Sequence, residues 1–276
     1  MKKAALHNLG CKVNAYETEA MQEILEKHGY EIVPFGEKAD VYLINTCSVT
    51  NIADRKSRQM LHRARKMNPD AVVIAAGCYV QAAGRELLQD SSVDILIGNN
   101  EKANLPEILK AWEEEHDASH IHDLTREHTY EELSLSHTAE HTRAYMKIQD
   151  GCNQFCTYCI IPKLRGNYRS FPMEKLVKEA EELAAQGVKE LILVAQETTL
   201  YGTDIYGKKS LHLLLKELCK IKGIRWIRVQ YCYPEEIYDE LIQTMKEEPK
   251  VCNYLDLPIQ HASDRILKRM GRRTSQ

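Results

Sequence analysis

Three cysteines fall within eight residues near the middle of the chain, in the segment GCNQFCTYCIIP. Cys152, Cys156 and Cys159 form the pattern C-x-x-x-C-x-x-C. On a helix this spacing would place three packed thiols on one face, but Gly151 before the segment and Pro162 after it favour a loop wrapped around a bound group. A structural zinc site needs four ligands, and no fourth is evident nearby. Three thiolates suit an iron–sulfur cube in which one iron is left open.

Three further cysteines, Cys11, Cys47 and Cys78, are far apart in the sequence. Each directly follows a short apolar run that predicts a buried strand, namely AALHNLG, DVYLINT and AVVIAAG. Parallel strands joined by helices end at one edge of their sheet, so we expect the three thiols to converge there as the ligands of a metal cluster. The alternative is three buried thiols at strand ends, because free cysteine packs as a small hydrophobe.

Composition indicates a folded globular protein with about two domains. The chain has 276 residues, of which 43% are hydrophobic and 28% charged. Its apolar runs fall far short of the roughly 20 residues of a membrane helix, and its first residues do not resemble a signal peptide. We therefore expect a cytoplasmic protein without a membrane partner, in which thiols stay reduced. A net charge of −3 argues against nucleic-acid binding over the whole surface.

The element pattern predicts two α/β domains. In residues 1–115, strands alternate with helices as in a Rossmann-like, doubly wound parallel sheet, but no G-x-G-x-x-G is present and dinucleotide binding is not indicated. Residues 116–142 are polar and hold six of the eleven histidines. We interpret them as a linker, with a histidine metal site as the less favoured alternative. The helices expected before the linker span 16–29, 52–68, 80–90 and 103–115.

A second series of strands and helices occupies residues 143–276. It predicts part of a β/α barrel that is incomplete at the C-terminal end, because the pattern stops inside a helix. The strands are expected at 143–149, 189–195, 224–231 and 253–259, and the helices at 173–186, 210–221 and 235–247.

The compact cysteine motif resembles that of the radical S-adenosylmethionine enzymes. The resemblance implies a [4Fe–4S] cluster whose open iron binds S-adenosylmethionine, and from which an electron releases a 5′-deoxyadenosyl radical. Its place after the first strand of a β/α barrel agrees, because catalytic groups gather at the carboxyl ends of barrel strands. Tyr158 occupies the position of an aromatic residue that lies beside the adenine in that family; simple packing is the alternative.

The flanks of the spread cysteines, GCKVN, NTCSV and GCYVQ, are similar to those of the methylthiotransferases within these enzymes. The resemblance covers nearly the whole chain. It implies a second [4Fe–4S] cluster on Cys11, Cys47 and Cys78 that carries the sulfur to be inserted, an external electron donor and a sulfur source. Complete members add two further strands and an RNA-binding TRAM β-barrel, which we do not find in this sequence.

The two halves of the chain resemble different branches of the family. Natural recombination between two genes or an error of sequence assembly would each produce such a hybrid. GCKVN, YETEA and GCYVQ are similar to the branch that methylthiolates carbon 2 of N6-threonylcarbamoyladenosine in tRNA, which is our leading hypothesis. VAQETTLYGTD and YLDLPIQHASDRILKRMGRR are more similar to the branch that modifies an aspartate of a small-subunit ribosomal protein. A third hypothesis is an iron–sulfur-binding fragment without activity.

Further residues are assigned by their position or by the resemblance. At the ends of two barrel strands, Gln196 and Glu197, and then Gln260, His261 and Ser263, are expected to contact the cofactor or substrate, although helix capping would also explain the first two. Arg165 and Gly166 match the family pattern without a defined role. Cys219, Cys232 and Cys252 are expected in the core. One basic helix could contact RNA phosphates, although such a face is more often merely solvated; its cations are Arg55, Lys56, Arg58, Arg63, Arg65 and Lys66.

Overall fold

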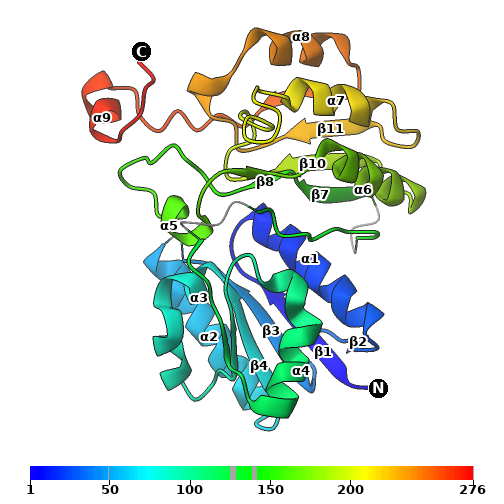
Figure 1. The fold of residues 1–276 in the computed structure, drawn as a ribbon, viewed down its shortest axis with the longest axis vertical. Coiled ribbons are helices and arrows are strands. Elements are labelled where there is room, and N and C mark those ends of the chain that lie inside the picture. The colour runs from blue at the N-terminus through cyan, green and yellow to red at the C-terminus, as the bar shows by residue number, and fades with distance from the viewer. Residues whose placement is uncertain (49, 125–128, 139–141, 276) are drawn as a thin grey trace. The chain divides into compact units, whose positions relative to one another are not determined.

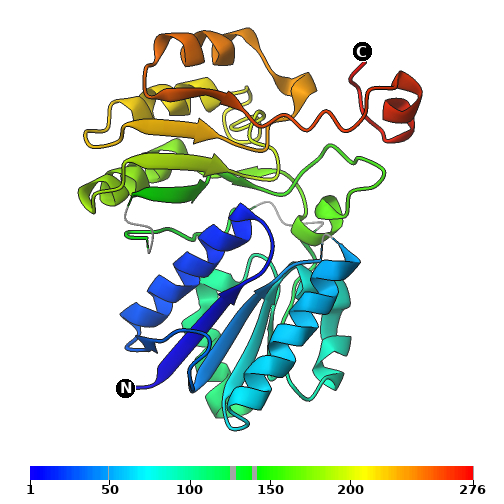
Figure 2. The same cartoon turned by 180° about the vertical axis from the view of Figure 1, so that it is seen from behind.

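The computed structural model describes residues 1–48, 50–124, 129–138 and 142–275. The chain forms two compact units, which are Met1–Leu124 with Glu131–Ser134 (unit 1) and Thr125–Tyr130 with Leu135–Gln276 (unit 2). Both units have parallel strands connected by helices (Figures 1 and 2). The predicted α/β class is confirmed.

Unit 1 is built on a six-stranded parallel sheet in the order β2-β1-β3-β4-β5-β6. Every residue of the central strand β3 is buried, as expected for a strand covered on both faces. Alternate residues of β3 enter two separate apolar cores, Tyr42 and Ile44 on one face and Val41 and Leu43 on the other. The strands are β1 (Lys3–Asn8), β2 (Glu31–Ile32), β3 (Val41–Thr46), β4 (Val72–Gly77), β5 (Ile95–Ile97) and β6 (Ser119–His120).

Helices cover both faces of this sheet, so the predicted doubly wound arrangement is confirmed. Leu25 of α1 and Ile108 of α4 enter one core, while Leu61 of α2 and Val80 of α3 enter the other. The helix expected over 80–90 is interrupted at Gly84, whose φ of +65° is not helical, and the chain continues as a 3-10 helix. The helices are α1 (Lys12–Lys27), α2 (Asn51–Met67), α3 (Cys78–Ala83), η1 (Gly84–Gln89), η2 (Lys102–Asn104) and α4 (Leu105–Glu115).

The polar segment 116–142 contributes more to the fold than its composition indicates. Its residues Ser119 and His120 form β6, which pairs with β5, and the side chains of Leu124 and Leu133 are buried. Among the described residues, no three His, Cys, Asp or Glu side chains are gathered around a metal position, so the histidine site finds no support there. His128 and His141 lie outside the described residues.

Unit 2 contains a four-stranded parallel sheet in the order β12-β11-β10-β7. β7 and β12 are its two edges, so within the described residues the sheet is open and not closed into a barrel. A separate antiparallel pair, β8 with β9, follows β7. The strands are β7 (Arg143–Lys147), β8 (Gln149–Asp150), β9 (Arg169–Ser170), β10 (Glu190–Val194), β11 (Trp226–Val229) and β12 (Val251–Leu255).

Three amphipathic helices, α6, α7 and α8, lie along one face of this sheet (Figures 1 and 2). Leu176, Ala180 and Leu183 of α6 form a buried stripe at helical spacing. The helices of unit 2 are α5 (Ile161–Arg165), α6 (Met173–Ala185), α7 (Leu211–Cys219), η4 (Pro234–Glu236), α8 (Asp239–Glu247) and α9 (Asp264–Arg269).

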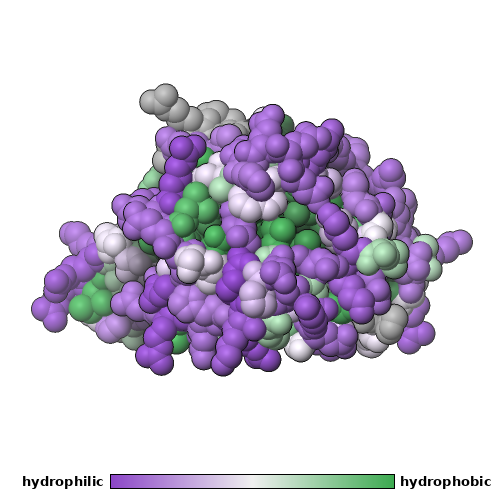
Figure 3. All heavy atoms as spheres, turned by 90° about the horizontal axis from the view of Figure 1, so that it is seen from below, coloured by the Kyte–Doolittle hydropathy of each residue, from purple (hydrophilic) through white to green (hydrophobic). Residues whose placement is uncertain are grey.

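The described helices are all too short or too polar to cross a membrane. The face drawn in Figure 3 is covered mainly by hydrophilic residues, with apolar residues showing only in limited areas between them.

Candidate metal centres

Cys11, Cys47 and Cys78 lie at the carboxyl ends of three neighbouring strands of unit 1. Cys47 directly follows β3 and Cys78 directly follows β4, and the last residues of these two strands are paired. Cys11 follows β1, whose last residue, Asn8, pairs with Asn45 of β3. The three cysteines thus follow neighbouring strands at one sheet edge, as expected. That their thiols converge as the ligands of one cluster stays a prediction.

The turn that follows β1 contacts Cys47 directly. Gly10 has a φ of +111°, and a Cβ at this position would lie 2.8 Å from Cβ and 3.0 Å from Sγ of Cys47. Asn14 fastens the same turn to the end of β3, because its Nδ2 donates to the carbonyl oxygens of Leu9 at 2.8 Å and Thr46 at 2.9 Å. Glycine is therefore required where the two cysteine-bearing segments meet.

The three thiols have different surroundings. Cys11 is exposed, whereas Cys47 and Cys78 are buried, and all three are free of disulfides. Cys11 Sγ lies 3.8 Å from Oδ1 of Asn14, while Nδ2 of Asn99 donates to Cys78 Sγ at 3.6 Å. Amide groups therefore adjoin two of the three sulfurs.

The residues at this edge fit an iron–sulfur cluster by their donor chemistry. Three thiols without disulfides are the protein ligands of a cube with one open iron, and a Cβ at Gly10 would lie 3.0 Å from Cys47 Sγ, so the absence of a side chain there keeps this sulfur uncovered by the Cys11 turn. Among the described residues, the sulfurs are not already gathered as a set of metal ligands. Ligation by these cysteines stays a prediction.

The compact triplet lies on a loop, as expected. Residues 151–160 are not helical, so the alternative of a helix with three thiols on one face is wrong. Gly151 starts the loop with a φ of +75°, and a Cβ there would lie 1.9 Å from the carbonyl oxygen of Asn167. The Cys152 N–H donates to the carbonyl oxygen of Gly166 at 3.2 Å, which closes the loop at its base.

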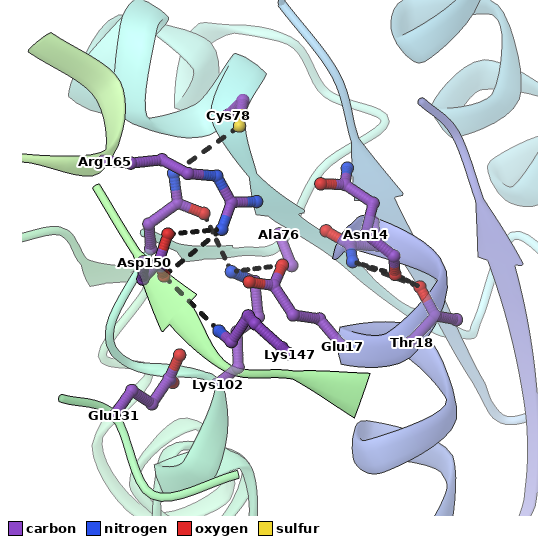
Figure 4. Close-up of polar contacts among 12 residues, drawn as sticks. Asn14, Glu17, Thr18, Ala76, Cys78, Lys102, Glu131, Lys147, Asp150 and Arg165 are labelled. Atoms are coloured by element: carbon purple, nitrogen blue, oxygen red, sulfur yellow. Dashed lines mark hydrogen bonds and ion pairs between the residues drawn. The ribbon is translucent and has the colours of Figure 1, made fainter. Parts of the chain in front are cut away.

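A buried ion-pair network holds the same base. Asp150 accepts from Nη1 of Arg165 at 3.1 Å, and Nζ of Lys147 lies 3.3 Å from its other carboxylate oxygen (Figure 4). The side chains of Lys147 and Arg165 are 0% and 1% exposed. Arg165 and Gly166, to which the sequence gave no role, thus both contact residues at the start of the cysteine loop, Asp150 and Cys152.

Burial opposes ionisation of the thiols in this loop. It raises the pKa of Cys152 to about 12 and also raises the pKa of Cys159. Cys156 Sγ lies 3.7 Å from the hydroxyl oxygen of Tyr233. Metals bind the thiolate, so a cluster held by this triplet would require Cys152 and Cys159 to lose their protons. Ligation by these cysteines, too, stays a prediction. Tyr158 is 50% exposed, which disfavours simple packing; its contact with the adenine stays a prediction.

Gln196 and Glu197 lie just beyond the end of β10. Oε1 of Gln196 is buried without a hydrogen-bond partner among the described residues. The Glu197 carboxylate accepts from the backbone N–H groups of Thr199 at 2.7 Å and Leu200 at 3.2 Å. Burial nevertheless raises the pKa of Glu197 to about 7. Contact of either residue with a cofactor stays a prediction. The capping alternative is wrong for Glu197, because its carboxylate closes a turn at Thr199 and Leu200, whereas the next helix, α7, begins at Leu211.

The expected position of Gln260, His261 and Ser263 at the end of a strand is wrong. β12 ends at Leu255, and Pro258 follows, which has no N–H to extend a sheet. Gln260, with a φ of +65°, and His261 are exposed, and Ser263 directly precedes α9. Their proposed contact with a cofactor or substrate is untested.

Two cations of the basic helix α2 have partners within unit 1. Arg58 donates to the Tyr79 hydroxyl at 3.0 Å, and Arg65 pairs with Asp94. Four others, Arg55, Lys56, Arg63 and Lys66, are exposed, and contact with RNA stays a prediction for the whole set.

Of the cysteines expected in the core, Cys232 is buried, whereas Cys219 and Cys252 are partly exposed.

Comparison with known sequences decides the family. Residues 3–98 match the uncharacterized protein family UPF0004, and residues 146–276 match the Radical SAM superfamily. Ribosomal protein uS12 methylthiotransferase RimO of Clostridium perfringens (strain SM101) is 43% identical over 99% of this chain and 62% of its own length. RimO of Clostridium botulinum (strain Eklund 17B) is 46% identical over 99% of this chain and 62% of its own length. The chain belongs to the radical S-adenosylmethionine methylthiotransferase family.

This membership supports the expected cofactors, [4Fe–4S] and S-adenosylmethionine. The chain spans about 62% of the length of the curated relatives it matches. Among solved structures, the radical S-adenosylmethionine methyltransferase TsrM from Kitasatospora setae has a TM-score of 0.68 at 15% identity, over 100% of this chain and 63% of that chain. A second TsrM structure, with cobalamin and a [4Fe–4S] cluster bound, has a TM-score of 0.67 at 16% identity, over 99% of this chain and 62% of that chain. At this identity the likeness shows the fold alone.

Sequence reasoning missed the buried polar residues that surround the spread cysteines of unit 1. Asn14, Asn45, Asn99 and Lys102 are all buried, at 1% exposure or less. Asn14 and Asn45 lie in the flanking motifs GCKVN and NTC. Their sequence signal was a polar residue next to a predicted buried strand, which could have indicated a buried hydrogen-bonding role. Asn99 and Lys102 follow β5, which carries no cysteine, and only the folded sheet places Asn99 beside Cys78.

Proposed function

We propose that this chain carries the radical chemistry of a methylthiotransferase acting on ribosomal protein uS12. The strongest support is that single relatives resemble both halves of the chain. Relatives named RimO align over 97% to 100% of this chain at 43% to 46% identity. The ribosomal-protein hypothesis therefore takes precedence over tRNA, which the N-terminal motifs had favoured.

In this proposal each unit holds one [4Fe–4S] cluster, on the spread triplet in unit 1 and the compact triplet in unit 2. Together the bound groups would supply a radical from S-adenosylmethionine and the sulfur for insertion. The chain itself holds the ligands in place. Gly10 and Asn14 fasten the Cys11 turn to the end of β3, and Asp150 and Arg165 close the loop that bears the compact triplet.

The chain also controls protons at these positions. The buried thiol of Cys152, whose pKa is about 12, must give up its proton when iron binds. Glu197, whose pKa is about 7, keeps a proton through mildly acidic pH at the end of β10. Reconstitution should therefore depend on pH, since thiolate is the ligand.

The first test counts clusters after anaerobic reconstitution with iron and sulfide. We expect two [4Fe–4S] clusters in the parent chain and one in each of two triple alanine variants, one for each cysteine triplet. A parent with one cluster, or with zinc alone, would contradict the proposal.

The second test identifies the substrate. The reconstituted chain is incubated with S-adenosylmethionine, dithionite, sulfide and either uS12 or tRNA that carries N6-threonylcarbamoyladenosine without a methylthio group, and the products are identified by mass spectrometry. Methylthiolated uS12 is expected. A methylthio nucleoside would establish the tRNA hypothesis instead, and intact clusters without cleavage of S-adenosylmethionine would favour the inactive fragment.

A further inference from the structure

The side-chain amide of Asn99 is oriented so that its N–H points at the sulfur of Cys78. Nδ2 lies 3.6 Å from Cys78 Sγ, and the two residues are 0% and 3% exposed. Oδ1 of the same amide accepts from Nζ of Lys102 at 2.8 Å. An ammonium group can only donate, so the amide oxygen must face Lys102 and the amide nitrogen must face the sulfur. The hydrogen-bond chemistry therefore fixes which end of Asn99 meets Cys78.

Lys102 is itself held by a buried partner. Its Nζ lies 3.0 Å from Oε2 of Glu17, and both side chains are 0% exposed (Figure 4). A buried ammonium group is stable only when it is paired and hydrogen-bonded, and Glu17 and Asn99 meet this need together. A continuous path of contacts therefore runs from α1 through η2 to the first residue of α3.

The backbone of Asn99 is fastened as well. Its N–H donates to Oε1 of Gln81 at 3.1 Å, and Gln81 lies on α3, the helix that Cys78 begins. Asn99 is thus held at its backbone by α3 and at its side chain by Lys102. Such a donor does not need to reorganise when the charge on the sulfur changes.

The amide beside Cys11 has the opposite orientation. Nδ2 of Asn14 donates to the carbonyl oxygens of Leu9 and Thr46, which leaves Oδ1 as the atom 3.8 Å from Cys11 Sγ. A hydrogen-bond donor therefore faces Cys78 where an acceptor faces Cys11. This contrast makes the two sulfurs electrostatically different.

We propose that Asn99 is a positioning residue that makes the unit 1 cluster easier to reduce, by donating to the sulfur of Cys78. This inference rests on the proposed function, in which Cys78 is a cluster ligand. Reduction adds one electron to the cluster, and its sulfur ligands share the added negative charge. An N–H directed at a ligand sulfur stabilises the reduced form more than the oxidised form, and such hydrogen bonds are among the factors that set cluster potentials.

The test uses the full chain with Cys152, Cys156 and Cys159 replaced by alanine, so that only the unit 1 cluster is present. After reconstitution, the midpoint potential is measured by dithionite titration followed by electron paramagnetic resonance. With Asn99→Ala we expect about a tenfold smaller reduction constant, which is about 59 mV for one electron. Asn99→Asp keeps an oxygen for Lys102 but presents no N–H to the sulfur, so it should lower the potential at least as much.

Asn68→Ala is the matched control, because it truncates another buried amide of unit 1. Asn68 is 4% exposed and its Nδ2 donates to the carbonyl oxygen of Ala39 at 2.8 Å. This variant should lose stability and keep the parent potential. A cluster-loaded Asn99→Ala chain with the parent potential would overturn the inference and leave the proposed function intact. Failure of the parent to bind any cluster would overturn both.

Discussion

The guanidinium group of Arg165 donates from Nη1 to both carboxylate oxygens of Asp150, at 3.1 and 3.3 Å. These two residues flank the segment that carries the compact cysteine triplet, so their contact joins its ends. Both side chains are buried, at 1% and 3% exposure. The ion pair is therefore part of the mechanism that shapes the loop before any metal binds.

Asp150→Asn should destabilise unit 2 strongly. It keeps the shape of the side chain and removes the charge that faces Arg165 and Lys147, and the loss of one partner from a buried ion pair typically costs about 3–5 kcal/mol. The free energy of unfolding in urea measures the effect. Lys178→Ala is the control, because Lys178 and Glu182 form an exposed pair at 3.9 Å, and it should change stability by about 0.5 kcal/mol or less. Equal effects of the two variants would show that the buried pair does not hold the loop.

Gly151→Ala should abolish iron binding by the compact triplet. The φ of +75° disfavours an L-residue, and the new Cβ would lie 1.9 Å from a backbone oxygen of Asn167, which cannot move independently. The number of iron atoms bound per reconstituted chain should fall by the number that one cluster contains. Gly187→Ala is matched in backbone conformation, with a φ of +99° and no atom within 4 Å of the added Cβ. That control should keep its iron, and an equal loss in both variants would contradict the argument.

Much of the fold was predictable because its signals are local. The strand before Cys47 is a continuous apolar run, and every residue of β3 is indeed buried. The stripe of Leu176, Ala180 and Leu183 in α6 repeats at helical spacing. In contrast, β6 has only two residues, Ser119 and His120, and they join the sheet through backbone pairing with β5. A polar two-residue strand has no periodicity to detect.

The cysteines of the candidate site were predictable, but the groups around them were not. Cys11, Cys47 and Cys78 could be placed at one edge of the sheet because each follows a predicted strand. Asn99 contacts Cys78 from the end of another strand, and nothing in the sequence around Asn99 indicates this contact. The end of β12 was misjudged for a related reason, since the apolar residues Leu257 and Ile259 continue the strand pattern while both are exposed.

Replacing the three cysteines outside the two triplets with alanine should leave iron binding unchanged. Cys232 is 1% exposed and its sulfur lies 3.5 Å from the Thr198 hydroxyl oxygen, so it is part of the packed interior. Each alanine variant of Cys219, Cys232 and Cys252 should lower the free energy of unfolding by about 1 kcal/mol, and by less at the two partly exposed positions. All three variants should keep the iron content of the parent. Cys156→Ala provides the contrast and should lose the cluster of unit 2. Loss of iron from the Cys232 variant would assign that residue to a metal site.

Glu197 should make the chain less stable as pH rises through the mildly acidic range. Glu197 is 2% exposed, and burial raises its pKa from 4.5 to about 7. Between these values the folded chain keeps the proton while the unfolded chain releases it, so each step up in pH favours unfolding. The contribution to stability is complete below pH 4.5, is lost as pH rises to about 7, and is constant above that. The shift corresponds to about 3 kcal/mol.

The comparison of the parent with Glu197→Gln isolates this effect from other titrating groups. Glutamine cannot ionise, and it keeps one oxygen that can accept from the Thr199 N–H. It loses only the longer contact with the Leu200 N–H, which involves the other carboxylate oxygen. The difference in unfolding free energy between the two chains, measured in urea from pH 4.5 to 8, should therefore shift in favour of the variant as pH rises. Glu174→Gln, which replaces an exposed carboxylate, should give no such trend. Parallel curves for the parent and Glu197→Gln would mean that Glu197 is ionised in the folded chain throughout this range, and that the network of N–H donors outweighs its burial.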